Sequence, residues 1–179
     1  MSAHLIMRQV GSMMLPTLVW RSWVSGWRQF DSLEAFMRED HPIDRLTVTV
    51  EGTVPASVAT SMQALSHRLA GRRQWVLGPP ELFDESDVHG GRSLGFALSI
   101  YTAQPPWGEG MDCAIDRAHL DEVKDLLGEI CRISGERDVS FVVEFAGESV
   151  GAVEEGRLDR SLEVGLIGEW QRVLDERNR

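Results

Sequence analysis

The sequence predicts an α+β fold in which helices pack mainly on one face of an antiparallel or mixed sheet. Residues 46–50 alternate apolar with polar side chains, as a strand with one buried face does. Amphipathic helices are expected between the strands, and only four residues separate the last two strands, residues 139–145 and 150–154. Such a short connection forms a hairpin and not a crossover, which favours this fold over an α/β arrangement.

The first 40 residues predict two strands and a short helix. Residues 5–10 and 16–24 are the expected strands. The second is ambiguous, because the tryptophans from residue 20 onward also fit helical spacing. Asp31 and Glu34 form a capping box before a helix over residues 32–39.

The segment after residue 52 predicts a helix, a short strand and a loop. Thr53 is the expected N-cap, Pro55 lies in the first turn, and Gly71 is the expected end. The inner face of this helix consists of Val58, Met62, Leu65 and Leu69. Residues 74–77 are expected to form a strand, and the polar, acidic residues 81–92 a loop.

A buried strand is expected over residues 94–103, and two helices follow further along the chain. Asp116 is the expected N-cap of the first and Gly135 its end. Its inner stripe comprises Leu120, Val123, Leu127, Ile130, Ile133 and Ser134. Asp159 is expected to cap the last helix, whose inward residues are Leu162, Leu166, Ile167, Trp170 and Val173.

The chain of 179 residues fits a single domain, residues 1–179; the alternative is a subdomain boundary near residue 105, where the composition shifts. Its net charge of −10 is concentrated in one part. Residues 1–108 contain 10 acids and 9 Lys or Arg, whereas residues 109–179 contain 18 acids and 9 Lys or Arg. This acidity argues against nucleic-acid binding and favours a basic partner, or it serves solubility alone.

Several functional classes lack their sequence signals. No apolar run reaches the length of a membrane span, and no signal peptide is recognisable, so we expect a cytoplasmic protein without a membrane partner. Cys113 and Cys131 lack zinc-type spacing, and the five histidines form no metal-binding pair. Neither a nucleophile elbow nor a phosphate-binding glycine loop occurs. We therefore expect no cofactor, no metal and no catalytic residue.

The expected loop before residue 92 contains a cluster of ionisable residues, Asp84, Glu85, Asp87 and His89. Such a cluster is suited to contact a basic partner or to hold a divalent ion. The simpler interpretation is a solvated loop.

A second acidic group, Asp121, Glu122, Asp125 and Glu129, follows one helix. Like charges four residues apart repel each other, so either the face is solvated or it meets a basic surface. The histidines His67 and His119 lie on expected helices, where a partly exposed histidine needs no function.

One tryptophan is also a candidate for contact with a partner. Trp75 and Trp170 lie on apolar stripes and are expected in the core, whereas Trp107 lies between prolines and glycines, where it either anchors a partner or folds back on the sheet. The predicted partner-binding residues are Asp84, Glu85, Asp87, Trp107, Glu109, Asp121 and Asp125.

Residues 151–174 read as a strand, an acidic turn and an amphipathic helix containing a Gly-Leu-Ile-Gly-Glu-Trp run. This portion resembles the C-terminal part of immunity proteins from bacterial polymorphic-toxin and type VI secretion systems. The resemblance implies an acidic α+β protein that binds a cognate toxin and occludes its active site. A nuclease or a nucleotide-consuming toxin would fit the charge best.

Three alternatives remain beside this interpretation. A phage-encoded acidic inhibitor that mimics DNA would have the same charge. A metal-dependent enzyme would use residues 84–89 as its site. A structural or assembly subunit would use the tryptophan-rich residues 13–30 as its interface.

Overall fold

The computed structural model describes residues 42–86, 88, 90–101 and 111–179. The strands expected over residues 5–10 and 16–24 and the helix expected over residues 32–39 lie outside these ranges, as does the end of the strand expected over residues 94–103.

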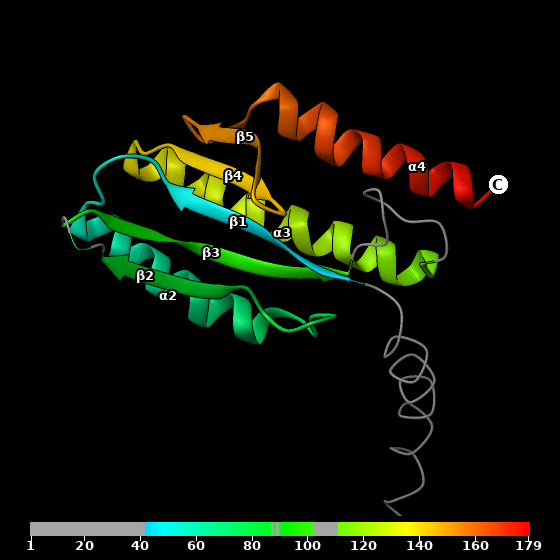
Figure 1. Ribbon diagram of the computed structural model, residues 1–179, viewed down its shortest axis with the longest axis horizontal. Helices are drawn as coiled ribbons and strands as arrows, with labels where there is room; N and C mark the ends of the chain where they lie inside the picture. Colours follow the sequence, from blue (N-terminus) through cyan, green and yellow to red (C-terminus); the bar gives the residue numbers. More distant parts are fainter. Residues whose placement is uncertain (1–41, 87, 89, 102–110) are drawn as a thin grey trace, which may run out of the picture. The chain divides into compact units, whose positions relative to one another are not determined.

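The described residues form a six-stranded antiparallel sheet (Figure 1). The strands, in the spatial order β2-β3-β1-β4-β5-β6, are β1 (Ile43–Val50), β2 (Glu81–Ser86), β3 (Arg92–Tyr101), β4 (Phe141–Phe145), β5 (Glu148–Glu154) and β6 (Arg157–Leu158). Every neighbouring pair is antiparallel. The α+β fold with an antiparallel sheet is therefore confirmed.

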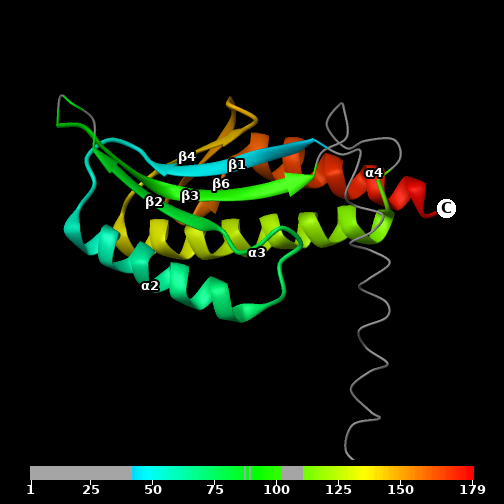
Figure 2. The same cartoon turned by 60° about the horizontal axis from the view of Figure 1, so that its bottom comes forward.

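The helices lie on one side of the sheet, where α2 (Ala56–Arg72) and α3 (Cys113–Arg137) run next to each other (Figure 2). A π-helix, η2 (Ser161–Gly168), continues into α4 (Glu169–Arg177) and packs beside α3 and β5. The first four strands with α2 and α3 have the βαββαβ order of the ferredoxin-like split motif. The β5–β6 hairpin and the last helix extend that motif at one edge.

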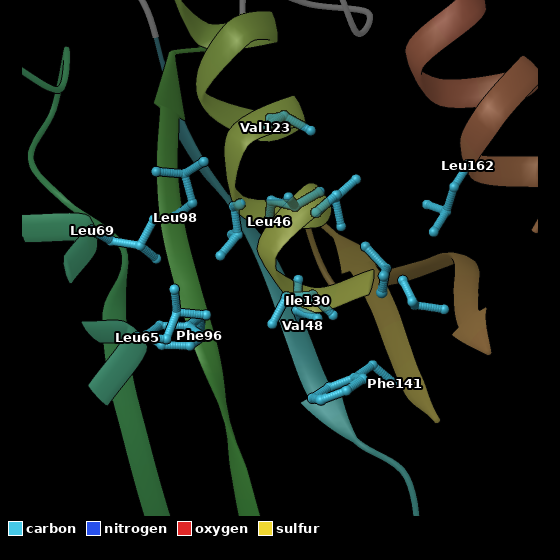
Figure 3. Close-up of a cluster of buried hydrophobic side chains, with 14 of the residues drawn as sticks. Leu46, Val48, Leu65, Leu69, Phe96, Leu98, Val123, Ile130, Phe141 and Leu162 are labelled. Carbon is cyan, nitrogen blue, oxygen red and sulfur yellow. The ribbon is translucent and has the colours of Figure 1, made fainter. Parts of the chain in front are cut away.

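Strand register separates the two faces of the sheet. Leu46 and Val48 of β1 pair with Leu98 and Phe96 of β3, and all four are fully buried against the helices (Figure 3). The inner stripes predicted for α2 and α3 are confirmed, because each of their residues is buried. We call the covered face of the sheet the helix side and the opposite face the open face.

The helix ends differ from the predictions. Pro55, and not Thr53, is the residue before α2, and Gly71 lies inside this helix. Asp112 is the N-cap of α3, where its side chain accepts a hydrogen bond from the Ala114 N–H at 2.7 Å. Asp116, the predicted cap, is instead a buried residue of the first turn.

The segment between α2 and β3 was predicted wrongly. Residues 74–77 form bends and no strand, whereas residues 81–86, predicted as part of a loop, form the edge strand β2. β2 pairs with β3 from Glu81 opposite Ala97 to Ser86 opposite Arg92. Charged residues in a strand are typical of a sheet edge, where they discourage pairing with other chains. The acidic composition is therefore compatible with an edge strand as well as with a loop.

The C-terminal predictions are largely confirmed. The turn of the β4–β5 hairpin is tighter than expected, because only Ala146 and Gly147, both with positive φ, separate the strands. Asp159 begins the last helix as predicted, since its Oδ1 accepts from the Leu162 N–H at 2.8 Å. Its Oδ2 also accepts from the Ala152 N–H at 3.0 Å, which fixes the helix to β5. Of the predicted inward residues, Leu162, Leu166 and Trp170 are buried, whereas Ile167 and Val173 are only partly buried. Leu174, which was not predicted, is fully buried in place of Val173.

Gly95 of β3 provides a test of the packing on the open face. A Cβ atom at this position would lie 2.5 Å from the Phe83 ring and 2.3 Å from the Val48 carbonyl oxygen. We expect Gly95→Ala to lower the free energy of unfolding by about 1–3 kcal/mol, because the ring and the strand must move. Chemical denaturation measures the change.

Gly128→Ala is the matched control, because a Cβ there meets no atom within 4 Å and the residue lies inside α3. It should raise the free energy of unfolding by up to about 1 kcal/mol, as alanine favours helix. If Gly95→Ala and Gly128→Ala change the free energy of unfolding equally, the Phe83 ring can move away from Gly95 without destabilising the fold.

Candidate functional site

The structure describes four of the seven predicted partner-binding residues and places them on two elements. Asp84 and Glu85 lie on the edge strand β2, whereas Asp121 and Asp125 lie on α3. Asp87, Trp107 and Glu109, together with His89, lie outside the described residues. β2 borders β3 and α2. The four residues therefore occupy separate regions and do not form a single acidic patch around one loop.

Asp84 is already engaged within the protein. Its two carboxylate oxygens accept from Nε and Nη2 of Arg92, each at 2.7 Å. These hydrogen bonds hold the pKa of Asp84 below its ordinary value, against a smaller opposing effect of burial. Glu85 is exposed and points to the other face of the sheet, because side chains alternate along a strand. The two carboxylates therefore diverge and do not converge on one ion.

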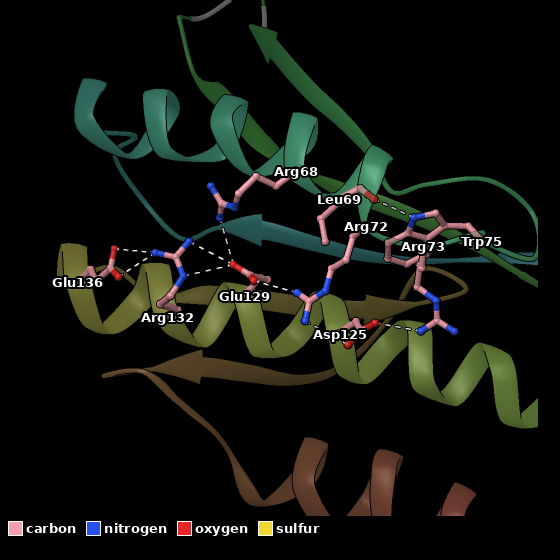
Figure 4. Close-up of polar contacts among 9 residues, drawn as sticks. All are labelled: Arg68, Leu69, Arg72, Arg73, Trp75, Asp125, Glu129, Arg132 and Glu136. Carbon is pink, nitrogen blue, oxygen red and sulfur yellow. Dashed lines mark hydrogen bonds and ion pairs between the residues drawn. The ribbon is translucent and has the colours of Figure 1, made fainter.

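The acids of α3 were expected either to be solvated or to meet a basic surface, and two of them meet arginines of this chain. Asp125 forms ion pairs with Arg73 at 2.9 Å and with Arg72 at 3.8 Å (Figure 4). These pairs join the end of α2 to the middle of α3. Of the four acids along α3, which are Asp121, Glu122, Asp125 and Glu129, only Asp121 is exposed.

Glu129 is the centre of the same ion-pair network. It pairs with Arg68 at 3.1 Å, with Arg72 at 2.9 Å and with Arg132 at 3.2 Å, and Arg132 continues to Glu136 at 2.7 Å. Burial is the largest single influence on the pKa of Glu129 and would raise it. The hydrogen bonds and charges of Arg68 and Arg132 together outweigh burial and lower this pKa.

A fully buried histidine and glutamate were missed by the sequence analysis. His119 and Glu122, one helical turn apart on α3, have no exposed side-chain surface, and His119 Nδ1 lies 3.1 Å from Glu122 Oε2. Glu122 Oε1 accepts from the Val76 N–H at 2.6 Å, and His119 Nε2 accepts from the Tyr101 N–H at 3.2 Å. An accepting Nε2 leaves the ring proton on Nδ1, which donates to Glu122.

This pair has the composition of an acid–base dyad, but its surroundings make it structural. Both outer atoms are occupied by backbone N–H groups, and neither side chain reaches solvent. A general base needs a free atom within hydrogen-bond reach of its substrate. The pair instead attaches α3 to the segment after α2 and to the end of β3.

Asp116 forms a second buried polar contact. Its Oδ1 accepts from Trp170 Nε1 and its Oδ2 from Arg177 Nη1, both at 2.6 Å. Arg177 also donates to the Met111 carbonyl oxygen. Trp170 and Arg177 are more than 50 residues away in the sequence, so the single sequence offered no signal for this contact.

Two tryptophans and a cysteine lie in or beside the hydrophobic core. Trp75 and Trp170 are buried, as expected. Cys131 packs beside the core, and burial raises the pKa of its thiol. Among the described residues, no group of three His, Cys, Asp or Glu side chains is arranged to hold a metal ion. None of the helices in this part of the chain is long and apolar enough to cross a membrane.

The open face carries side chains that the sequence analysis did not select. Thr47 of β1 is in register with Ala97 and Glu144, and Ala97 is in register with Glu81. By the same pairing, a second row contains Phe83, Gly95, Thr49, Val142 and Ala152. The alternation of residues 46–50 had indicated that one face of this strand is polar. It could not reveal which acids of the neighbouring strands lie on the same face of the sheet.

Comparison with protein-family models, with curated proteins and with solved structures found no match for this chain. The ferredoxin-like order of its elements accommodates many unrelated functions, so the fold alone does not select one.

The Glu122 contact provides a test of a structural role. Glu122→Ala should lower the free energy of unfolding by roughly 2–4 kcal/mol, because it leaves the Val76 N–H and His119 buried without their acceptor. Asp121→Ala, at the exposed neighbouring position, should change it by no more than about 0.5 kcal/mol. A well-folded, equally stable Glu122→Ala protein would contradict the structural assignment. Denaturant titration of both variants gives the comparison.

The Glu129 network predicts a pH dependence. Because its pKa is lowered in the folded chain, Glu129 stabilises the fold above the ordinary glutamate pKa, and this contribution disappears as the pH falls through the folded value. Glu129→Gln should therefore cost roughly 1 kcal/mol at neutral pH and much less in strong acid.

Glu136→Gln is the control, since this more exposed partner of Arg132 should contribute less than about 0.5 kcal/mol at any pH. Unfolding curves of both variants and the unaltered chain across the acid range provide the measurement. A Glu129→Gln cost that does not change with pH would show that packing, and not charge, is responsible.

Proposed function

We propose that this chain is an immunity-type inhibitor, which binds one cognate bacterial toxin and occludes the active site of that toxin through an acidic surface. The concentration of acid carries the proposal, because residues 109–179 hold 18 acids against 9 Lys or Arg. The resemblance of residues 151–174 to immunity proteins supports the same class. The cytoplasm is the compartment in which such an inhibitor would meet a toxin that acts on nucleic acids or nucleotides.

Charge gives the inhibitor a physical mechanism. A toxin that cleaves or consumes an anionic substrate presents basic residues at its active site, and carboxylates can occupy those positions in place of phosphates. An opposite field accelerates the encounter and selects the partner. The interaction would weaken as salt screens the charges.

An affinity experiment tests the proposal. The tagged full-length chain, expressed in the organism that encodes it, should retain one basic protein whose activity is lost in the complex. We expect the affinity of the purified pair to fall at least about tenfold between low and high salt, because the attraction is electrostatic. Isothermal titration at several salt concentrations measures this change.

An unrelated acidic protein of similar size and net charge is the control, and it should neither bind the captured protein tightly nor inhibit it. If the chain retains no protein, or retains one whose activity is unchanged in the complex, the proposal is wrong. Capture of a host nuclease encoded outside the neighbouring genes would instead favour a phage-type DNA mimic.

A further inference from the structure

We infer that the open face of the sheet is the surface that binds a basic partner, and this inference rests on the function proposed above. The open face includes Thr47, Thr49, Glu81, Phe83, Glu85, Gly95, Ala97, Val142, Glu144 and Ala152. In the described part of the chain, α2 and α3 pack on the helix side (Figure 2), η2 packs on β5 and α4 packs on α3.

The centre of the open face consists of small residues and one aromatic side chain. Gly95, Ala97 and Ala152 contribute little or no side chain, and Gly95 and Ala97 are buried beneath their neighbours. The ring of Phe83 lies against Gly95 and is only partly buried. An apolar centre with a partly exposed aromatic ring is the usual composition of an interface core.

Three carboxylates of the open face lie around this centre, in the rows of side chains that the strand register aligns. Glu81, Glu85 and Glu144 are exposed, and no ion pair within the described residues engages any of them. Glu144 accepts only a hydrogen bond from the Thr47 hydroxyl, at 3.3 Å. On the helix side, by contrast, arginines neutralise Asp84 and Glu129. Arg45, near the start of β1, and Arg157 of β6, which is in register with Glu154, are exposed bases on the open face.

This charge pattern selects the occupant. A second copy of the chain would bring carboxylates against carboxylates, which disfavours a symmetric dimer through this face. A partner with an apolar centre and surrounding arginines or lysines would satisfy both the Phe83 region and the acids. The occupant that fits is therefore a basic protein surface.

A synthetic peptide of alternating arginine and leucine is a suitable probe of this surface. Titrated into the isotope-labelled full-length chain, it should shift amide signals of Thr47, Phe83 and Glu144 more than those of the α3 residues. A matched peptide with glutamate in place of arginine should leave the spectrum unchanged. Shifts confined to α3 or α4 would overturn the inference.

Charge reversal distinguishes the two sides of the sheet. The triple variant Glu81→Arg, Glu85→Arg, Glu144→Arg should weaken peptide binding at least about tenfold. The control triple, Asp121→Arg, Glu136→Arg, Glu163→Arg, changes the net charge equally on the helix side and should weaken it less than about threefold. Thermal unfolding of both triples verifies that they are folded, and Phe83→Ala tests the apolar centre without a change of charge.

The outcomes separate this inference from the proposed function. If the captured toxin binds both triples equally, the chain is still an inhibitor but uses another surface. If the peptide maps to the open face and no toxin is retained, the surface stands and the proposed partner class is wrong. Two results would overturn the inference by showing that something else covers the open face. One is protection of Phe83 from solvent in the free chain. The other is a dimer of the chain that dissociates in the open-face triple variant but not in the control triple.

Discussion

Buried polar side chains of α3 determine how the other elements are placed. Four of them, Asp116, His119, Glu122 and Ser134, are at most 2% exposed. Asp116 holds α4, His119 holds the end of β3, and Glu122 holds the segment after α2. Ser134 accepts from the N–H of Gly156 in the β5–β6 turn at 3.1 Å. Apolar packing allows small shifts of a helix along a sheet, whereas hydrogen bonds of buried groups permit one position, because a lost partner leaves an unsatisfied polar group.

This arrangement also accounts for the distribution of charge. α2 supplies Arg68 and Arg72 where α3 supplies Glu129 and Asp125, so the helix layer neutralises much of its own acid. The like-charge repulsion expected along α3 is thereby relieved by a neighbouring helix. A rigid, neutralised helix layer supports a sheet whose other face is left with free carboxylates. The binding surface that we infer for the open face depends on this difference between the two sides of the sheet.

The sequence predicted those elements whose signal is local. The alternation in β1, the apolar stripes of α2 and α3, and the cap at Asp159 all depend on residues within a few positions of each other, and they are confirmed. β2 was missed because an edge strand is half solvated and its acids resemble those of a loop. The role of Asp116 was missed for another reason. An acid just before an apolar stripe has the sequence pattern of an N-cap, whether or not it is buried. The arginine that makes the burial of Asp116 favourable is 61 residues away in the sequence.

The candidate surface shows why composition alone could not locate a binding site. Net charge counts every carboxylate equally, but a carboxylate that accepts two hydrogen bonds from an arginine presents little field to a partner. Asp84 and Asp125 were selected from the sequence and are compensated, whereas Glu85 and Asp121 were selected and are uncompensated. Glu81 and Glu144 were not selected and are also uncompensated. The difference depends on which strand lies beside which, and that is settled by register. The field that a partner meets is therefore a property of the sheet and not of any one segment.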